Sequence, residues 1–229
     1  HMESLQSYVT SIGADIGLAF DGDADRMLAV DENGKIIDGD QIMAVCAKYM
    51  LENNKLKQNT LVATVMSNLG LFIAGEKLGI NIPRTKVGDR YVLEEMLDKG
   101  YSIGGEQSGH IIFLEHNTTG DGLVSALQFL SVLKKTSQKA SEAASIVEVL
   151  PQVLVNATVK PENKEKYMEV EEIAEACKKV EEKFAGEGRV LIRPSGTEPL
   201  VRVMIEGKDK DVLQAEAEKL ASLIEKILG

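Results

Sequence analysis

The sequence predicts a layered α/β domain followed by a small α+β domain of the βαββα type. Between residues 39 and 136, segments with apolar residues at helical spacing alternate with short runs rich in β-branched residues. Such alternation favours a sheet layered between helices. After Pro151 the order becomes strand, helix, strand, strand, helix, which is long enough for a separate small domain.

The first predicted strands enclose an acidic loop. Residues 16–20 (IGLAF) and 27–30 (MLAV) have the composition of short strands, and DGDADR lies between them. Asn33-Gly34 then supplies a hairpin-type turn. We assign residues 1–38 to a first segment that carries this loop.

The α/β domain is expected over residues 39–142. Gly79 and Gly100 each lie where a helical pattern stops, as is common just past the end of a helix. Its helices are predicted over 39–54, 71–79, 89–100 and 120–136, and its strands over 60–66, 80–87 and on either side of the glycine-rich loop 104–110.

The C-terminal domain is expected over residues 143–229. Residues 137–151 predict a short helix or linker at its boundary. Its strands are predicted over 152–159, 189–193 and 200–207, and its helices over 171–184 and 211–228.

Composition excludes several partners. The net charge is −10, and the lysines of 160–183 are interleaved with glutamates, so no basic patch predicts a nucleic-acid partner. No apolar run is long enough to span a membrane. Cys46 and Cys177 are the two cysteines, and we expect both to be reduced in a cytoplasmic protein.

The acidic loop places Asp21, Asp23 and Asp25 at alternate positions, where their like charges repel unless solvent or a cation compensates. Oxygen ligands suit a hard cation, Mg²⁺ or Ca²⁺. A helix–loop–helix Ca²⁺ site is rejected because its sixth position, which needs glycine, is Arg26 and because the flanks are strand-like. A metal site beside a phosphate is favoured over a solvated acidic turn, since Arg26 can hold phosphate oxygens.

Two further loops carry polar side chains on flexible backbone. In GGEQSGH (104–110), Glu106, Ser108 and His110 favour recognition of hydroxyl groups on a sugar-like ligand, although a plain glycine-rich turn stays open. In RPSGTEP (193–199), guanidinium and hydroxyl groups gather around a tight turn. That collection favours phosphate binding over an ordinary hairpin loop.

Together these motifs resemble the α-D-phosphohexomutase superfamily and, within it, the phosphoglucosamine mutases. The matching motifs are DGDADR at 21–26, KVGDRYV at 86–92, GGEQSGH at 104–110, TTGDG at 118–122 and RPSGTEP at 193–199. The resemblance implies phosphoryl exchange between a serine phosphate and a phosphosugar, with glucosamine phosphate favoured as the substrate. It also implies Mg²⁺ as the cofactor.

The resemblance assigns roles residue by residue. Asp21, Asp23 and Asp25 would ligate Mg²⁺ beside the phosphoserine. The remaining roles are catalysis for Arg26 and Lys86, sugar binding for Glu106, Ser108, His110, Asp89 and Arg90, and phosphate binding for Arg193, Ser195, Gly196, Thr197 and Arg202.

One family motif is missing. The phosphorylated serine lies in a segment resembling S-H-N-P, and no histidine here is followed by Asn-Pro. We therefore expect the sequence to represent about the second half of the enzyme, with residues 1–38 as the remnant of a second domain. The missing N-terminal domains would be its partners, and the chain alone would be inactive.

Two alternatives stay open. A phosphomannomutase or phosphoglucomutase of the same superfamily would use the same chemistry on a different sugar. A non-catalytic phosphosugar-binding module would keep the scaffold without the reaction.

Overall fold

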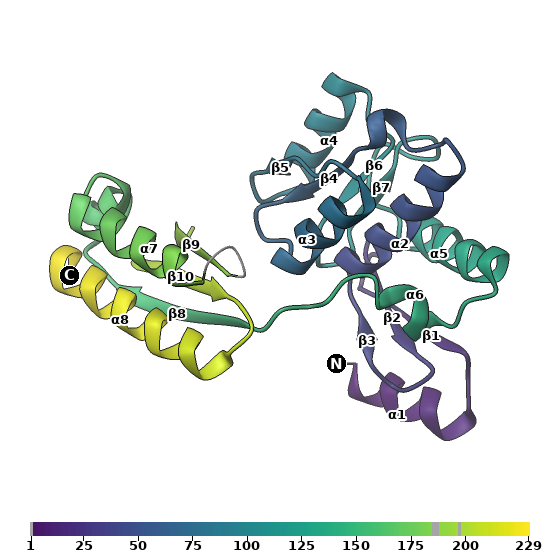
Figure 1. Cartoon of the computed structure of the whole chain (residues 1–229), viewed down its shortest axis with the longest axis horizontal. Coiled ribbons are helices and arrows are strands. Elements are labelled where there is room, and N and C mark those ends of the chain that lie inside the picture. Colours follow the sequence, from purple (N-terminus) through teal and green to yellow (C-terminus); the bar gives the residue numbers. More distant parts are fainter. Residues whose placement is uncertain (1, 185–187, 197) are drawn as a thin grey trace. The chain divides into compact units, whose positions relative to one another are not determined.

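A computed structural model describes residues 2–184, 188–196 and 198–229. The chain forms two compact units, unit 1 up to Glu148 and unit 2 from Val149 (Figure 1). No helix among the described residues is long and apolar enough to cross a membrane.

Unit 1 begins with a helix and a three-stranded antiparallel sheet in the order β1-β2-β3. The two predicted strands and the hairpin turn are confirmed, whereas the helix was not predicted. These elements are α1 (Glu3–Ile12), β1 (Ile16–Phe20), β2 (Met27–Asp31) and β3 (Ile36–Ile37).

The rest of unit 1 is built around a four-stranded sheet in the order β5-β4-β6-β7, in which β4 runs parallel to β5 and β6 while β7 is antiparallel to β6. β5 covers two of the eight residues predicted as a strand, because Pro83 has no N–H to donate to a ladder. The elements are α2 (Gly39–Glu52), β4 (Leu61–Thr64), α3 (Leu69–Leu78), β5 (Arg84–Thr85), α4 (Asp89–Lys99), β6 (Ile103–Gly105), β7 (Ile111–Phe113), α5 (Gly122–Thr136) and α6 (Ala140–Ala144).

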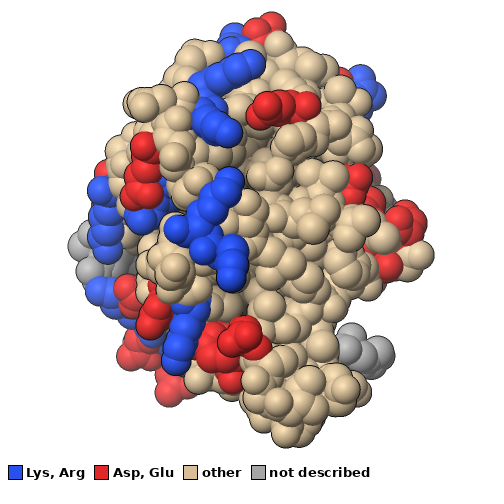
Figure 2. All heavy atoms as spheres, turned by 90° about the vertical axis from the view of Figure 1, so that its right-hand side faces the viewer, with Lys and Arg blue, Asp and Glu red and all other residues tan. Residues whose placement is uncertain are grey.

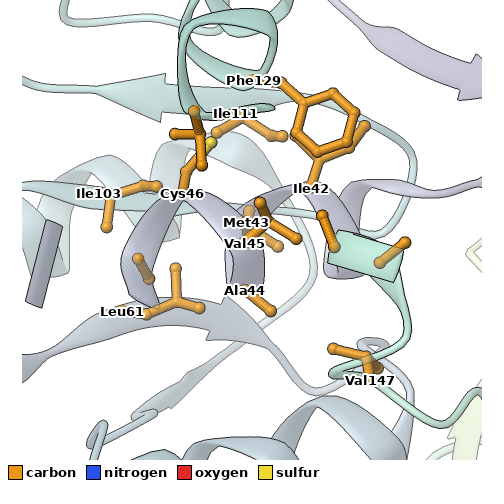
Figure 3. Close-up of a cluster of buried hydrophobic side chains, with 14 of the residues drawn as sticks. Ile42, Met43, Ala44, Val45, Cys46, Leu61, Ile103, Ile111, Phe129 and Val147 are labelled. Carbon is orange, nitrogen blue, oxygen red and sulfur yellow. The ribbon is translucent and has the colours of Figure 1, made fainter. Parts of the chain in front are cut away.

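Helices cover both faces of this sheet, as the sequence predicts. On one face, Ile42 and Cys46 of α2 lie in the same buried cluster as Leu61 and Ile103 of the strands (Figure 3). On the other face, Val92 and Met96 of α4 pack on Val62 and Ile112.

The same core extends into the first sheet. Met27 and Ala29 of β2 and Ile37 of β3 belong to the cluster that α2 builds with the four-stranded sheet. Asp38 starts α2 directly after β3, and its side chain accepts a hydrogen bond from the Gln41 N–H in a capping box. The acidic loop is therefore held against the α/β layer by shared packing.

Unit 2 has the predicted βαββα order, with an antiparallel sheet in the order β8-β10-β9. Val201, Val203 and Ile205 of β10 point into the core that the helices cover. The alternate residues of β10 lie on the opposite face. The elements are β8 (Gln152–Thr158), α7 (Glu171–Phe184), β9 (Arg189–Pro194), β10 (Leu200–Glu206) and α8 (Lys210–Leu228).

Candidate functional site

The acidic loop between β1 and β2 gathers three carboxylates. Oxygen atoms of Asp21, Asp23 and Asp25 lie within 4.8 Å of one another. Asp25 Oδ1 is buried and receives no hydrogen bond from the residues that the structure describes. A buried carboxylate oxygen without a donor is costly unless a cation approaches it. The donor set, oxygen only, fits Mg²⁺.

Arg26 supplies the positive charge next to these carboxylates. Its backbone N–H donates to Asp21 Oδ1 at 3.2 Å, and its Nε lies 3.8 Å from Asp21 Oδ2 and 3.9 Å from Asp25 Oδ1. Loss of solvent contact acts to raise the pKa of Asp21, but the hydrogen bond from the Arg26 N–H and the nearby guanidinium charge act against it, and the net result is a lowered pKa. Half of the Arg26 side chain remains exposed and can meet a ligand.

His110 joins the acidic loop to two other loops. The Gly120 N–H donates to His110 Nε2 at 3.0 Å, which leaves the ring proton on Nδ1. Nδ1 lies 3.0 Å from Asp25 Oδ2, so the imidazole donates to the second oxygen of that carboxylate. Asp89 Oδ2 lies 3.8 Å from Nε2. Asp25 thus has one oxygen anchored by His110 and a second, Oδ1, that lies near the Arg26 guanidinium and receives no hydrogen bond from the described residues.

The loop after β6 is fixed mainly through its backbone. The Gly39 N–H donates to the Gln107 carbonyl at 3.0 Å, and the Met27 N–H donates to the Gly109 carbonyl at 3.1 Å. Gln107 Nε2 donates to Asp38 Oδ2 at 3.1 Å. Burial raises the pKa of Asp38, and its hydrogen bonds offset only part of that rise.

Glycine is required at position 109 by conformation and by space. Its φ is +94°, and a Cβ there would lie 2.3 Å from the Met27 carbonyl oxygen. Only glycine allows this loop to approach β2 so closely.

Glu106 meets the loop before α4. Its Oε1 accepts a hydrogen bond from the Gly88 N–H at 3.0 Å, so its carboxylate lies at the N-terminus of α4, where negative charge is favoured. Ser108 is exposed at the tip of the loop. The structure thus brings Glu106 and Asp89 to the same group of loops as the acidic triplet.

Two predicted residues of the α4 loop point elsewhere. Arg90 donates to Glu94 Oε1 at 2.7 Å on the surface of α4, rather than to the carboxylate cluster. Lys86 is exposed, with its Nζ 5.8 Å from the centroid of the Tyr91 ring. Both side chains can rotate into solvent because neither is buried.

Unit 2 carries the second group of predicted residues. Arg193 of β9 and Arg202 of β10 are direct cross-strand partners on one face of the sheet. Like charges in this position repel, which an anion would relieve. Glu198 supplies one, because its Oε2 accepts from Arg202 Nη2 at 3.1 Å.

Ser195 forms the hydrogen bond at the base of the turn that lies beside these arginines. Its N–H donates to the Leu200 carbonyl at 2.8 Å, and its buried hydroxyl lies 3.4 Å from Arg202 Nη2. Chain neighbours aside, no atom of the described residues lies within 4 Å of a Cβ built on Gly196, so there is space beside its backbone. Thr197 lies outside the described residues.

Sequence reasoning missed three contributors to these groups. Lys164 Nζ donates to the Ser195 carbonyl at 2.6 Å, but it belongs to a Lys- and Glu-rich stretch that reads as a solvated surface. Asp38 directly precedes the helix predicted from residue 39, and nothing in the sequence pairs it with Gln107. Gly120 lies in TTGDG, which signalled its importance without its role as the donor to His110.

An α/β domain with these loops, followed by a βαββα domain, has the fold of the α-D-phosphohexomutase superfamily. N-acetylglucosamine-phosphate mutase in its product complex matches with a TM-score of 0.75 at 22% identity, over 91% of this chain and 48% of that one. Aspergillus fumigatus N-acetylphosphoglucosamine mutase, in complex with GlcNAc-6P and magnesium, also matches with 0.75 at 20% identity, over 93% and 49%.

The chain belongs to the phosphoglucomutase/phosphomannomutase family. Its residues match the family's alpha/beta/alpha domain II at 1–34, alpha/beta/alpha domain III at 38–150 and C-terminal domain at 154–223. Phosphoglucosamine mutase of Ruminiclostridium cellulolyticum is 64% identical over 98% of this chain and 50% of that protein. The Acetivibrio thermocellus counterpart is 63% identical over all of this chain and 51% of its own length. The chain thus spans about half the length of these relatives.

Proposed function

We propose that the chain is the C-terminal half of a phosphoglucosamine mutase, which interconverts glucosamine 6-phosphate and glucosamine 1-phosphate. The observation that carries the proposal is the convergence of the Asp21–Asp25 carboxylates, His110 and Glu106 from loops far apart in sequence. The names of the relatives support the choice of sugar. The reaction belongs to the full-length enzyme, in which a phosphoserine outside this chain carries the phosphoryl group, and the chain alone is expected to be inactive.

In this proposal the acidic loop holds Mg²⁺ through Asp21, Asp23 and Asp25. When bound, Mg²⁺ neutralises charge on the phosphoryl oxygens. Arg26 adds a guanidinium on the exposed side of the loop and orients the same phosphate, and Lys86 can swing toward it. Phosphoryl transfer depends chiefly on such charge neutralisation and positioning.

The other loops hold the substrate. Glu106 accepts hydrogen bonds from sugar hydroxyls, and the hydrogen bond from the Gly88 N–H to its Oε1 fixes the orientation of the carboxylate. Ser108 contributes its exposed hydroxyl. Asp89 and Arg90 complete the sugar-binding group, and His110, whose ring nitrogens are taken by Asp25 and the Gly120 N–H, lies beside it. In unit 2, the phosphate that is not transferred is held by Arg193, Ser195, Gly196, Thr197 and Arg202.

The thiols support the cytoplasmic setting that the proposal includes. Cys46 is buried and Cys177 half-buried, and neither forms a disulfide within the described residues. Two reduced thiols together with a phosphosugar substrate support a cytoplasmic enzyme.

The proposal is tested by calorimetric titration of the chain with glucosamine 6-phosphate in Mg²⁺. Arg193→Ala and Glu106→Gln are each expected to weaken binding about 10- to 100-fold, because a hydrogen bond to a charged group contributes about 1.5–3 kcal/mol. Lys179→Ala and Glu115→Gln, which remove charges outside both groups, serve as matched controls. Unchanged affinity in Arg193→Ala would contradict the phosphate assignment.

A panel of sugars decides between the family's substrates. Glucose 6-phosphate and mannose 6-phosphate are expected to bind more weakly than the amino sugar. Equal binding of all three sugar phosphates would contradict the assignment of glucosamine phosphate as the substrate. It would favour a phosphoglucomutase or phosphomannomutase, which the family description also names.

His110 is expected to act on the metal through Asp25. His110→Leu removes the donor to Asp25 Oδ2 and should weaken cation binding about 10- to 100-fold, as for other groups that orient a metal ligand. His110→Asn keeps an N–H near the position of Nδ1 and should retain most of the affinity.

Mn²⁺ is the probe for this prediction, because it accepts the same oxygen donors and broadens nearby amide resonances. Broadening at residues 21–26 is recorded against Mn²⁺ concentration, with His116→Asn as the control. Equal affinity for His110→Leu and the unaltered chain would rule out the positioning role.

A further inference from the structure

Unit 1 contains a cavity at the opposite end of β6 from the candidate site. Ser102 lines this cavity directly before β6, and Glu106 of the candidate site follows the same strand. Four residues of extended strand place these two positions about 13 Å apart. All lining residues lie between 46 and 135, inside the stretch that matches one family domain.

The floor of the cavity is apolar and its side wall is aromatic. The floor is formed by Cys46 and Phe113, which are buried, and Tyr49 of α2 also lines the cavity. The cavity volume is about 220 Å³. A cavity of about 150 Å³ is enough to hold a benzene molecule, so this one has room for a ring and a charged substituent.

The mouth is cationic. The mouth is the exposed part of the lining, which includes Lys55 and Lys135; Glu115 is the one carboxylate among the lining residues. Lys135 Nζ lies 5.6 Å from the centroid of the Tyr49 ring, which holds the ammonium over the aromatic wall. Figure 2 shows Lys and Arg side chains close together on the face that it draws, with Asp and Glu side chains among them, although the net charge of the chain is −10.

Polar side chains of the lining are held by hydrogen bonds within the protein. His116 Nε2 lies 2.8 Å from Gln128 Nε2, and Ser102 Oγ accepts from the Lys57 N–H at 3.1 Å.

We propose that this cavity is a second ligand site, for a small monocyclic aromatic carboxylate or phosphate. The ring would lie on the apolar floor against Tyr49, and the anionic group would pair with Lys55 and Lys135. The site is independent of the sugar and metal groups described above, since it shares no residue with them.

The test is a series of ¹H–¹⁵N NMR titrations of the 229-residue chain. Phenyl phosphate and benzoate are the probes, benzyl alcohol is the uncharged ring, and inorganic phosphate is the anion without a ring. The two aromatic anions should shift resonances around the cavity, and each control compound should bind at least five-fold more weakly.

Variants locate the binding. Lys55→Met/Lys135→Met should weaken phenyl phosphate at least five-fold, whereas Lys134→Met, a neighbouring exposed lysine outside this cavity, should leave it unchanged. Both replaced lysines are exposed, so folding is preserved. Equal affinity in the double variant, equal binding of benzyl alcohol or inorganic phosphate, or shifts confined to 21–26 and 104–110 would each overturn the proposal.

Discussion

Replacing Gly39 with alanine is expected to lower the free energy of unfolding by about 3 kcal/mol, because the new methyl group has no space. A Cβ at Gly39 would lie 2.2 Å from the Glu106 carbonyl oxygen and 2.7 Å from the Gly109 nitrogen. Both are backbone atoms of the loop after β6, so they cannot rotate away. The loop must move, and its hydrogen bond from the Gly39 N–H is lost with it.

Calorimetric unfolding checks this expectation, with a fall in Tm on the order of 10 °C. Gly22→Ala is the matched control, since no atom lies within 4 Å of a Cβ at that position. The displaced loop should also weaken binding of glucosamine 6-phosphate through Glu106. A Gly39→Ala protein with unaltered Tm would contradict the expectation, because it would mean that the loop after β6 can shift away from the new methyl group without loss of stability.

The second large effect is expected in unit 2, at a buried ion pair. Arg189 Nε donates to Glu206 Oε2 across β9 and β10, and the Glu206 side chain is fully buried. Arg189→Met removes this positive partner from a buried carboxylate, which should cost about 3–5 kcal/mol.

A double variant separates the pair from simple packing. Arg189→Met/Glu206→Leu replaces both charges with apolar side chains and should recover most of the lost stability, since the Glu206 carboxylate is no longer left buried without Arg189. Urea unfolding of the single and double variants measures the difference. A double variant as unstable as Arg189→Met would show that packing, not charge, dominates.

Most of the fold could be predicted because helices and strands differ in apolar spacing. α2 and α5 have clear helical periods, and glycine follows α3 and α4 where their patterns stop. The helix α1 was missed because its N-cap residue, Met2, offers no side-chain cap. Its apolar residues at 5, 8, 9 and 12, followed by Gly13, are the signal that could have revealed it.

The residue types of the candidate site were readable, but their partners were not. Alternate aspartates indicate a cation, yet nothing local in the sequence shows that His110 donates to Asp25, because 85 residues separate them. Arg90 illustrates the reverse case: its motif suggests a ligand, but Glu94 lies one helical turn away and takes the guanidinium. Such pairings depend on tertiary packing or on competition between neighbours.

Because Glu198 contacts Arg202, phosphate binding at this arginine is a replacement of one anion by another. Because Glu198 already neutralises this guanidinium, an incoming phosphate exchanges with an internal carboxylate instead of adding to a bare cation. Exchange alters the net charge at the arginine less than addition would, so the affinity should depend only weakly on ionic strength. It also couples occupancy to the turn that carries Glu198, since a displaced carboxylate must find a new position in solvent.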